Sequence, residues 1–231
     1  MNQLKQVTEL ICLVSHLNGL VYMSHRDFAT SSLSYLNKDA LFDLRGSRKI
    51  DDDYWSTLDG FSTLGPLLFY IEGLKEGGGV GLQGPDRIAH SVTAKSVTLL
   101  LDVDRKVLVH HFAEIDFLDD ERPLVIVQPA KPLSRNSQYA LMVHNARGVD
   151  GEFLPPTPGF KALMEGNFTD DDQLSQRASH FRDELLPTFQ EAASWLELMS
   201  QNVIQLLFDF HTASAESQLG NARGIRDSGK Q

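Results

Sequence analysis

Short apolar runs dominate the middle of the chain, and their length and composition predict β-strands. Glycine, proline or polar residues bound each run, as expected of buried strands. Only Asp104 and Arg105 separate the second run from the third, which predicts a hairpin. The runs, rich in branched and aromatic residues, occupy residues 66–71, 96–103, 106–113, 123–128, 138–144 and 203–210.

Segments predicted to be helical lie before and near the end of this strand-rich region. Residues 3–20 predict an N-terminal helix because their apolar side chains recur along one stripe, formed by Leu4, Val7, Leu10, Ile11, Val14 and Leu17. Near the C-terminus, Thr169 precedes an acidic first turn and predicts the start of a helix. Pro187 predicts a break and a second helix over 187–201. Pro155, Pro156 and Pro158 predict an irregular connection before this helical pair.

These elements predict a mainly β (α+β) protein built as a β-sandwich. We expect an N-terminal helical or irregular extension over residues 1–55. The sandwich module is expected over residues 56–214, with a helical insertion at 170–201. Residues 215–231 are rich in Ser, Gly and Asn and predict a flexible tail.

Composition narrows the range of partners. The chain has 231 residues, with 31 acidic residues against 21 Lys and Arg, and its formal net charge of −10 argues against nucleic acid or an anionic membrane as partner. No apolar run reaches the about 20 residues of a transmembrane segment, and Lys5 and Glu9 make the N-terminus a poor signal peptide. Cys12 is the single cysteine, so neither an internal disulfide nor a cysteine zinc site is predicted.

A glycine-rich loop has the spacing of a dinucleotide-binding fingerprint, with Gly79, Gly81 and Gly84 at the three glycine positions. That fingerprint needs a helix whose N-terminus holds the pyrophosphate. Pro85 follows at once, and no amphipathic helix is predicted after it. The sequence therefore predicts a loop and no cofactor.

Two histidines and two acids form a metal-like cluster on paper: His110, His111, Glu114 and Asp116. In a strand, neighbouring side chains point to opposite faces, so His110 and His111 diverge. His110 and Glu114 share a face but lie about 13 Å apart at about 3.3 Å per residue, too far for one ion. Only a bulge would bring them together, so no metal site is predicted.

Ser62 is the candidate nucleophile of a serine hydrolase. It lies between Gly60 and Gly65, a spacing one residue longer than that of the hydrolase elbow Gly-x-Ser-x-Gly, and it precedes a strand instead of joining a strand to a helix. A small esterase with a triad of Ser62, a histidine and an acid stays as an alternative. A second alternative is a degraded gene product, whose mark would be an apolar face left open where a partner domain once docked.

Five segments, taken in order, match the pattern of one protein family. They are residues 58–63 followed by 66–70, residues 112–116, residues 125–133 followed by 137–143, residues 149–151 with 158–160, and residues 207–214. Together they resemble the N-terminal, immunoglobulin-like β-rich region of large bacterial lipase-like proteins, in which this region precedes an α/β-hydrolase domain. The resemblance spans residues 58–227, and Asp104-Arg105 stands where the family usually has a glycine turn.

The resemblance implies a non-catalytic accessory or interaction module without the hydrolase domain. No catalytic residue carries over, because the nucleophile of these relatives would lie outside this chain. The implied partner is a hydrolase-type catalytic domain or another protein, and the implied location is secreted or in the cell envelope.

The motif residues would then be structural. Asp59 and Gly60 would set a turn into the first core strand, Glu114 and Asp116 would anchor the hairpin exit through backbone N–H groups, and Tyr139 would pack across the sheet. The resemblance adds further motif residues at Phe61, Ser62, Pro129 and Asp209.

Overall fold

The computed structural model describes residues 59–75, 77–116, 123–166, 178–195 and 203–217, together with residues 175, 219, 226 and 228; the side chains of 193 and 195 are not described. The predicted helix over 3–20 and the predicted cap at Thr169 lie outside these ranges. The strands are β1 (Leu67–Phe69), β2 (Thr98–Asp102), β3 (Val107–Leu108), β4 (His111–Ile115), β5 (Val125–Pro129), β6 (Gln138–His144) and β7 (Ile204–His211). The helical segments are η2 (Pro85–Val92), α3 (Pro158–Glu165), η3 (Phe181–Leu185) and α5 (Leu186–Trp195).

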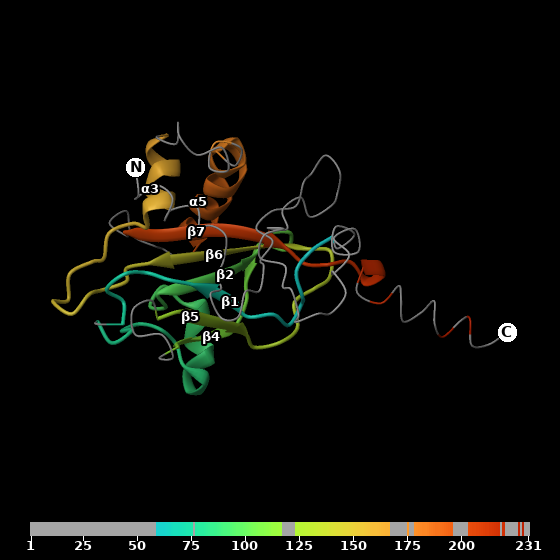
Figure 1. Ribbon diagram of the computed structural model, residues 1–231, viewed down its shortest axis with the longest axis horizontal. Coiled ribbons are helices and arrows are strands. Elements are labelled where there is room, and N and C mark those ends of the chain that lie inside the picture. Colours follow the sequence, from blue (N-terminus) through green and yellow to red (C-terminus); the bar gives the residue numbers. More distant parts are fainter. Residues whose placement is uncertain are drawn as a thin grey trace, which may run out of the picture.

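Two antiparallel sheets form the centre of the fold, which confirms the mainly β (α+β) class (Figure 1). One sheet has three strands in the order β1-β5-β4, and the other has four in the order β3-β2-β6-β7. The chain passes between the two sheets after β1, after β3 and after β5. The sheets therefore share one interior although no strand pair joins them.

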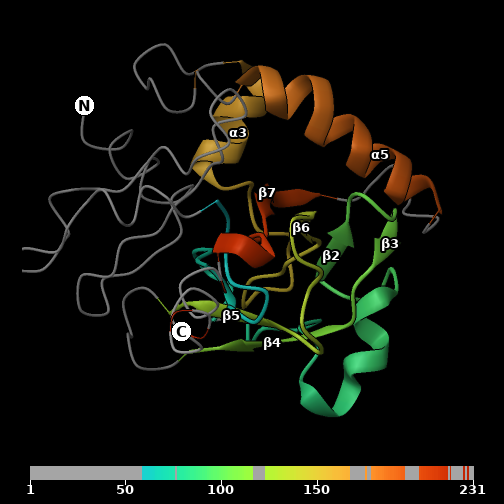
Figure 2. The ribbon, with the colours of Figure 1, turned by 90° about the vertical axis from the view of Figure 1, so that its right-hand side faces the viewer.

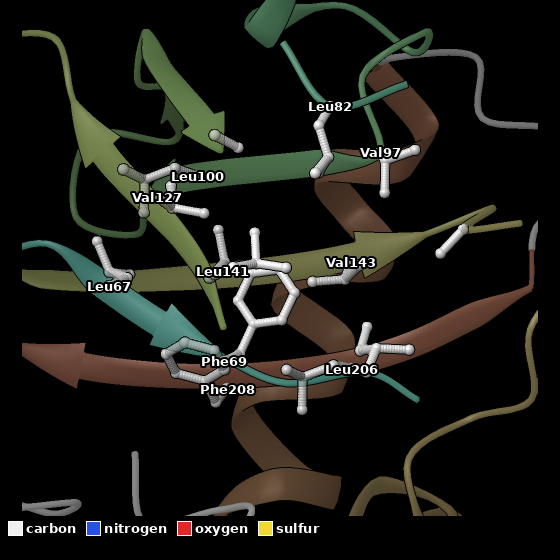
Figure 3. Close-up of a cluster of buried hydrophobic side chains, with 14 of the residues drawn as sticks. Leu67, Phe69, Leu82, Val97, Leu100, Val127, Leu141, Val143, Leu206 and Phe208 are labelled. Carbon is white, nitrogen blue, oxygen red and sulfur yellow. The ribbon is translucent and has the colours of Figure 1, made fainter. Parts of the chain in front are cut away.

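Apolar side chains from alternate strand positions fill the space between the two sheets. On β6, Tyr139, Leu141 and Val143 point into this interior. They meet Leu67 and Phe69 from β1 and further apolar side chains from both sheets (Figure 3). Because successive residues of a strand face opposite sides, one face of each strand except the short β3 contributes to this core. The interior is thus the apolar layer of a two-sheet sandwich.

Helices cover the outer face of the four-stranded sheet (Figure 2). The alternate residues of β6, Ala140 and Met142, pack with Leu99 and Leu101 of β2 in a second apolar cluster. Helical side chains complete that cluster: Phe160, Phe181, Leu185, Phe189 and Ala192. β2 and β6 are therefore buried on both faces, which explains why their sequences are nearly continuous apolar runs.

The predicted hairpin over 96–113 is only half correct. β2 pairs with β3 through Leu101↔Leu108 and Asp102↔Val107. The chain then leaves this sheet, and β4 pairs with β5 in the other sheet. The polar pair His110-His111 stands at this change, but the residues on both sides of it are strand-like in composition, so the sequence predicts one strand.

Helix α3 begins at a proline, in the segment where the sequence predicted an irregular connection. Pro158 is the first residue of α3 and lacks only an N–H that would be unpaired there. The helical insertion therefore starts before residue 170. Pro187 is the second residue of α5, but the break predicted there is absent: residues 178–195 are continuously helical, and the π-helical turn η3 runs directly into α5. Beyond β7, residues 215–217 form a helical turn at the beginning of the expected flexible tail.

Candidate functional site

The first and last motif segments meet in space, although about 150 positions separate them. Asp59 accepts a 2.9 Å hydrogen bond from the Ser214 N–H through its Oδ1. Phe61 donates from its N–H to the His211 carbonyl at 2.8 Å and accepts from the Ala213 N–H at 2.8 Å. We call this contact, residues 59–61 against residues 210–214, the terminal seam. It joins the segment before β1 to the end of β7.

Gly60 lies at the tightest point of the terminal seam. A Cβ atom at this position would lie 2.5 Å from the backbone of Thr212 and of Ala213. Real Cβ contacts are essentially never shorter than 3.0 Å, and backbone atoms cannot swing away as side chains do. Glycine at this motif position is therefore required by close backbone approach.

Three aromatic rings extend the terminal seam into the sandwich core. Phe61 meets Phe210 edge to face, with ring centroids 6.1 Å apart. Phe210 stacks on Tyr139, with centroids 5.7 Å apart. The Tyr139 ring is buried, and its hydroxyl accepts a 2.9 Å hydrogen bond from the Ser134 N–H. Tyr139 thus packs within the core and also fixes the loop before β6.

Ser62 does not have the surroundings of a catalytic serine. Its side chain is exposed, and its Oγ accepts a hydrogen bond from the Leu64 N–H at 3.2 Å, a local turn contact. In the part of the chain that the structure describes, no histidine is hydrogen-bonded to Ser62. The hydroxyl therefore stabilises the turn into β1, and within the described ranges no general base is hydrogen-bonded to it.

The structure brings His180 and Glu184, which the sequence analysis missed, together with the motif residue Asp209. His180 Nε2 lies 2.7 Å from Asp209 Oδ2, and His180 Nδ1 lies 3.1 Å from Glu184 Oε2. Gln138 also donates to Asp209 Oδ2, at 2.9 Å. The His180 and Asp209 side chains are only 10% and 8% exposed. The i, i+4 spacing of His180 and Glu184 was a usable signal, but the contact with Asp209 depends on how the helices fold over β7.

His180, Glu184 and Asp209 form what we call the His180 cluster. It resembles part of a catalytic triad but lacks the geometry of one. A triad histidine directs one ring nitrogen at an acid and the other at the nucleophile. Here both ring nitrogens face carboxylates, and only the doubly protonated ring can donate to both. The cluster is therefore a hydrogen-bonded link between the helical layer and the four-stranded sheet.

His110 and His111 diverge as predicted. His110 is exposed, whereas His111 is fully buried. The His111 ring bonds to Thr98 Oγ1 at 2.8 Å and to the Val109 carbonyl at 2.9 Å. Burial lowers the pKa of His111, so its ring is neutral near pH 7. Among the described residues, no three His, Cys, Asp or Glu side chains lie close enough to hold a metal ion.

His144, the last residue of β6, is a buried histidine of a different kind. Its side chain is almost fully buried, and neither ring nitrogen has a hydrogen-bond partner within the described ranges. Burial lowers the pKa of His144, and the backbone of Ser96 acts in the opposite direction. A buried polar group without a partner reduces stability, so His144 is a weak point of this core.

The remaining motif residues lie on the three-stranded sheet. Glu114 is exposed on β4, and its carboxylate makes no hydrogen bond to a backbone N–H in the described structure. Asp116 donates its own N–H to the Leu124 carbonyl at 2.7 Å, which continues the β4–β5 pairing. Pro129, the last residue of β5, is buried opposite His111. The carboxylate anchor expected of Glu114 is therefore replaced by backbone pairing.

The glycine-rich loop packs against the sandwich. Gly79 and Gly81 adopt left-handed φ angles, and the side chains of Ile115 and Val97 lie where their Cβ atoms would be. A helical segment does follow Gly84, contrary to the sequence analysis, but η2 is a 3₁₀ helix interrupted at Arg87. The α-helix start on which a dinucleotide fingerprint depends is not formed there.

Comparison of the chain with known protein families and with curated proteins finds no match. No helix in the described ranges is long and apolar enough to cross a membrane. The function is therefore inferred from the geometry of the terminal seam and its surroundings.

Proposed function

We propose that this chain is a non-catalytic accessory module, similar to the N-terminal region of bacterial lipase-like proteins, with an immunoglobulin-like fold. Its work would be to pack against a hydrolase-type catalytic domain or to bind another protein. One observation carries the proposal: the motif residues Asp59, Gly60, Phe61 and Tyr139 bond to or pack against other parts of the same sandwich. These residues therefore have a structural role within the sandwich.

The strand order supports the immunoglobulin-like part of the proposal. Such sandwiches place strands B, E and D in one sheet and C′, C, F and G in the other. If β1 is aligned with strand B, the order β1-β5-β4 corresponds to B-E-D. The order β3-β2-β6-β7 then corresponds to C′-C-F-G. In this alignment the helical insertion lies between F and G.

Tyr139 gives independent support for the same alignment. Many immunoglobulin-like domains have a tyrosine near the start of strand F whose hydroxyl bonds to the backbone a few residues upstream. Tyr139 is the second residue of β6, and its hydroxyl accepts from the Ser134 N–H. Two residues on, the fully buried Leu141 stands where disulfide-bonded domains carry a cysteine. A packed leucine at this position suits a chain with a single cysteine.

The structural contacts of the serine and histidine side chains support the non-catalytic part of the proposal. Ser62 bonds to its own turn, and both His180 nitrogens face carboxylates. His111 is held by Thr98 and by the Val109 carbonyl. These groups are occupied by structural contacts, so none of them is poised for acyl transfer.

A broad esterase assay tests this proposal. The purified full chain is assayed with short and long acyl esters beside the Ser62→Ala variant and a buffer control. We expect hydrolysis equal to that of the buffer for both proteins, with cooperative thermal unfolding showing that both are folded. Turnover by the wild-type chain that disappears in Ser62→Ala would contradict the accessory role and support a serine hydrolase.

A further inference from the structure

One end of the sandwich is built from two loops that lie side by side. The hairpin over residues 146–154 joins β6 to the helical insertion, and the glycine-rich loop over residues 77–81 lies beside it. A Cβ on Gly77 would come within 3.0 Å of the backbone of Arg147 and Gly148, so the two loops are in direct backbone contact. We call this pair of loops the loop end. It lies at the other end of the sheets from the helical turn at 215–217 (Figure 1).

The loop end exposes several large apolar side chains. Val149 is 81% exposed at the tip of the hairpin, and Phe153 is 40% exposed on its returning arm. Val80, on the neighbouring loop, is 64% exposed. Single exposed apolar residues are common on protein surfaces, but a group of them on adjoining loops is typical of an interaction site.

The hairpin that carries Val149 is held rigidly. Backbone hydrogen bonds join Gly148 to Glu152 at 3.0 Å and Leu154 to Ala146 at 2.8 Å. The tip is closed by the Gly151 N–H, which donates to the Gly148 carbonyl at 3.1 Å, and Glu152 donates its N–H to Asp150 Oδ1 at 3.0 Å. Val149 is therefore presented in a fixed position, which lowers the entropic cost of binding a partner.

Arg147 adds a charged contact to this apolar surface. Its guanidinium lies 4.0 Å from the centroid of the Phe153 ring and donates to the Gly151 carbonyl. The group is exposed, and most of its five N–H donors are directed to no residue of the described structure. A carboxylate is the natural partner of such a guanidinium, and arginine is enriched at protein interfaces.

The charges around Val149 favour a protein partner over a lipid bilayer. Asp150 and Glu152 are exposed and flank the hairpin tip. Insertion of Val149 into a bilayer would bring these carboxylates toward the acyl chains at a large desolvation cost. A protein surface can instead leave them at its solvated rim.

We propose that the loop end is the docking surface of this module for a polypeptide partner that presents an apolar side chain next to a carboxylate. Val149, Phe153 and Val80 bury against the apolar part, and Arg147 pairs with the carboxylate. This inference rests on the proposed accessory function and names the surface that performs it.

Selection from a random displayed-peptide library tests the docking surface. The immobilised full chain is the target, and selected peptides are synthesised and titrated against wild type, Val149→Asp, Arg147→Gln and Val107→Asp. Val107 is the matched control, because it is an exposed valine on the edge strand β3, outside the loop end. We expect acidic peptides with a neighbouring apolar residue, about tenfold weaker binding to each loop-end variant, and unchanged binding to Val107→Asp.

Three results would overturn the docking surface: no peptide enriched above background, peptides that bind Val149→Asp as well as wild type, or flotation with phosphatidylcholine vesicles that Val149→Asp abolishes. The last result would identify a lipid partner. None of them bears on esterase activity, so failure of the docking surface and failure of the accessory role are distinguishable. Unchanged thermal unfolding of each variant shows that a loss of binding is not a loss of fold.

Discussion

Asp59 Oδ1 accepts a 2.9 Å hydrogen bond from the backbone N–H of Ser214, 155 positions further along the chain. Ser214 in turn caps the helical turn at 215–217, because its Oγ accepts from the Ser217 N–H at 3.0 Å. A single carboxylate therefore ties the entry to β1 to the exit from β7. In an accessory module, such a tie would fix the direction in which the chain leaves the sandwich.

Gly60→Ala should destabilise the fold strongly. The added methyl group would lie 2.5 Å from the Thr212 and Ala213 backbones, so the terminal seam would have to open. We expect a loss of about 1–3 kcal/mol in the free energy of unfolding, measured by urea denaturation. Gly65→Ala is the matched control. Its Cβ would meet its nearest atom at 3.5 Å, an ordinary contact, and the change should stay within about 1 kcal/mol of wild type. Equal stability of the two variants would show that the seam is not close-packed.

Tyr139→Phe should reveal the contribution of the hydroxyl alone. The ring stack with Phe210 is kept, but the Ser134 N–H loses its acceptor. We expect a loss of about 1 kcal/mol in the free energy of unfolding. Tyr139→Leu, which also removes the ring, should cost more than Tyr139→Phe. If Tyr139→Phe is as stable as wild type, the contact with Ser134 does not hold the loop before β6.

The strands were the most predictable part of the fold, because the apolar pattern that indicates a strand lies within the strand itself. Residues 138–144 were predicted at their observed bounds, since a run buried on both faces leaves a continuous apolar signal. The sheet to which a strand belongs is not local information. Residues 106–113 were predicted as one strand, yet they contribute to both sheets, with His110 and His111 at the change. That division is decided by packing between sheets, which no short segment encodes.

The fold should lose stability as the pH falls below about 6.5. Burial lowers the pKa of both His111 and His144 below the ordinary value of 6.5, so the unfolded chain binds more protons in this range. Stability is then fully present above 6.5 and falls as the pH drops toward the folded-state values, by up to about 1.4 kcal/mol per pH unit for each histidine.

His144→Leu should flatten this acid dependence, because it removes one of the two titrating groups together with an unpartnered polar ring. Urea denaturation between pH 7 and pH 5 measures the slope of the free energy of unfolding against pH. A His144→Leu slope identical to that of wild type would mean that burial does not lower the pKa of the His144 ring.

His180→Gln should loosen the helical layer. The variant removes the 2.7 Å contact from the His180 ring to Asp209 Oδ2, and a buried carboxylate that loses a hydrogen-bond donor is destabilised. We expect a loss of about 2–3 kcal/mol and faster hydrogen exchange in α5. Glu184→Gln is the control, since Glu184 is exposed and its loss should cost less than about 1 kcal/mol. Equal effects of the two variants would contradict an anchoring role for Asp209.

The contacts of the site were less predictable than the strands, because they join distant segments. The resemblance named Asp59 and Asp209, but it did not identify Ser214 or His180 as their partners. The resemblance implied an anchoring role for Glu114, and the structure leaves it exposed. A carboxylate in a short motif carries no information about which distant backbone or ring will face it.

The most direct test of the central claim, that the motif residues form a structural seam, compares Asp59→Ala with Ser62→Ala by urea denaturation. The seam predicts a loss of about 1–3 kcal/mol for Asp59→Ala, because the Ser214 N–H loses a charged acceptor. It predicts a change within about 0.5 kcal/mol for Ser62→Ala, whose exposed hydroxyl makes one local turn contact. An Asp59→Ala variant as stable as wild type would contradict the account.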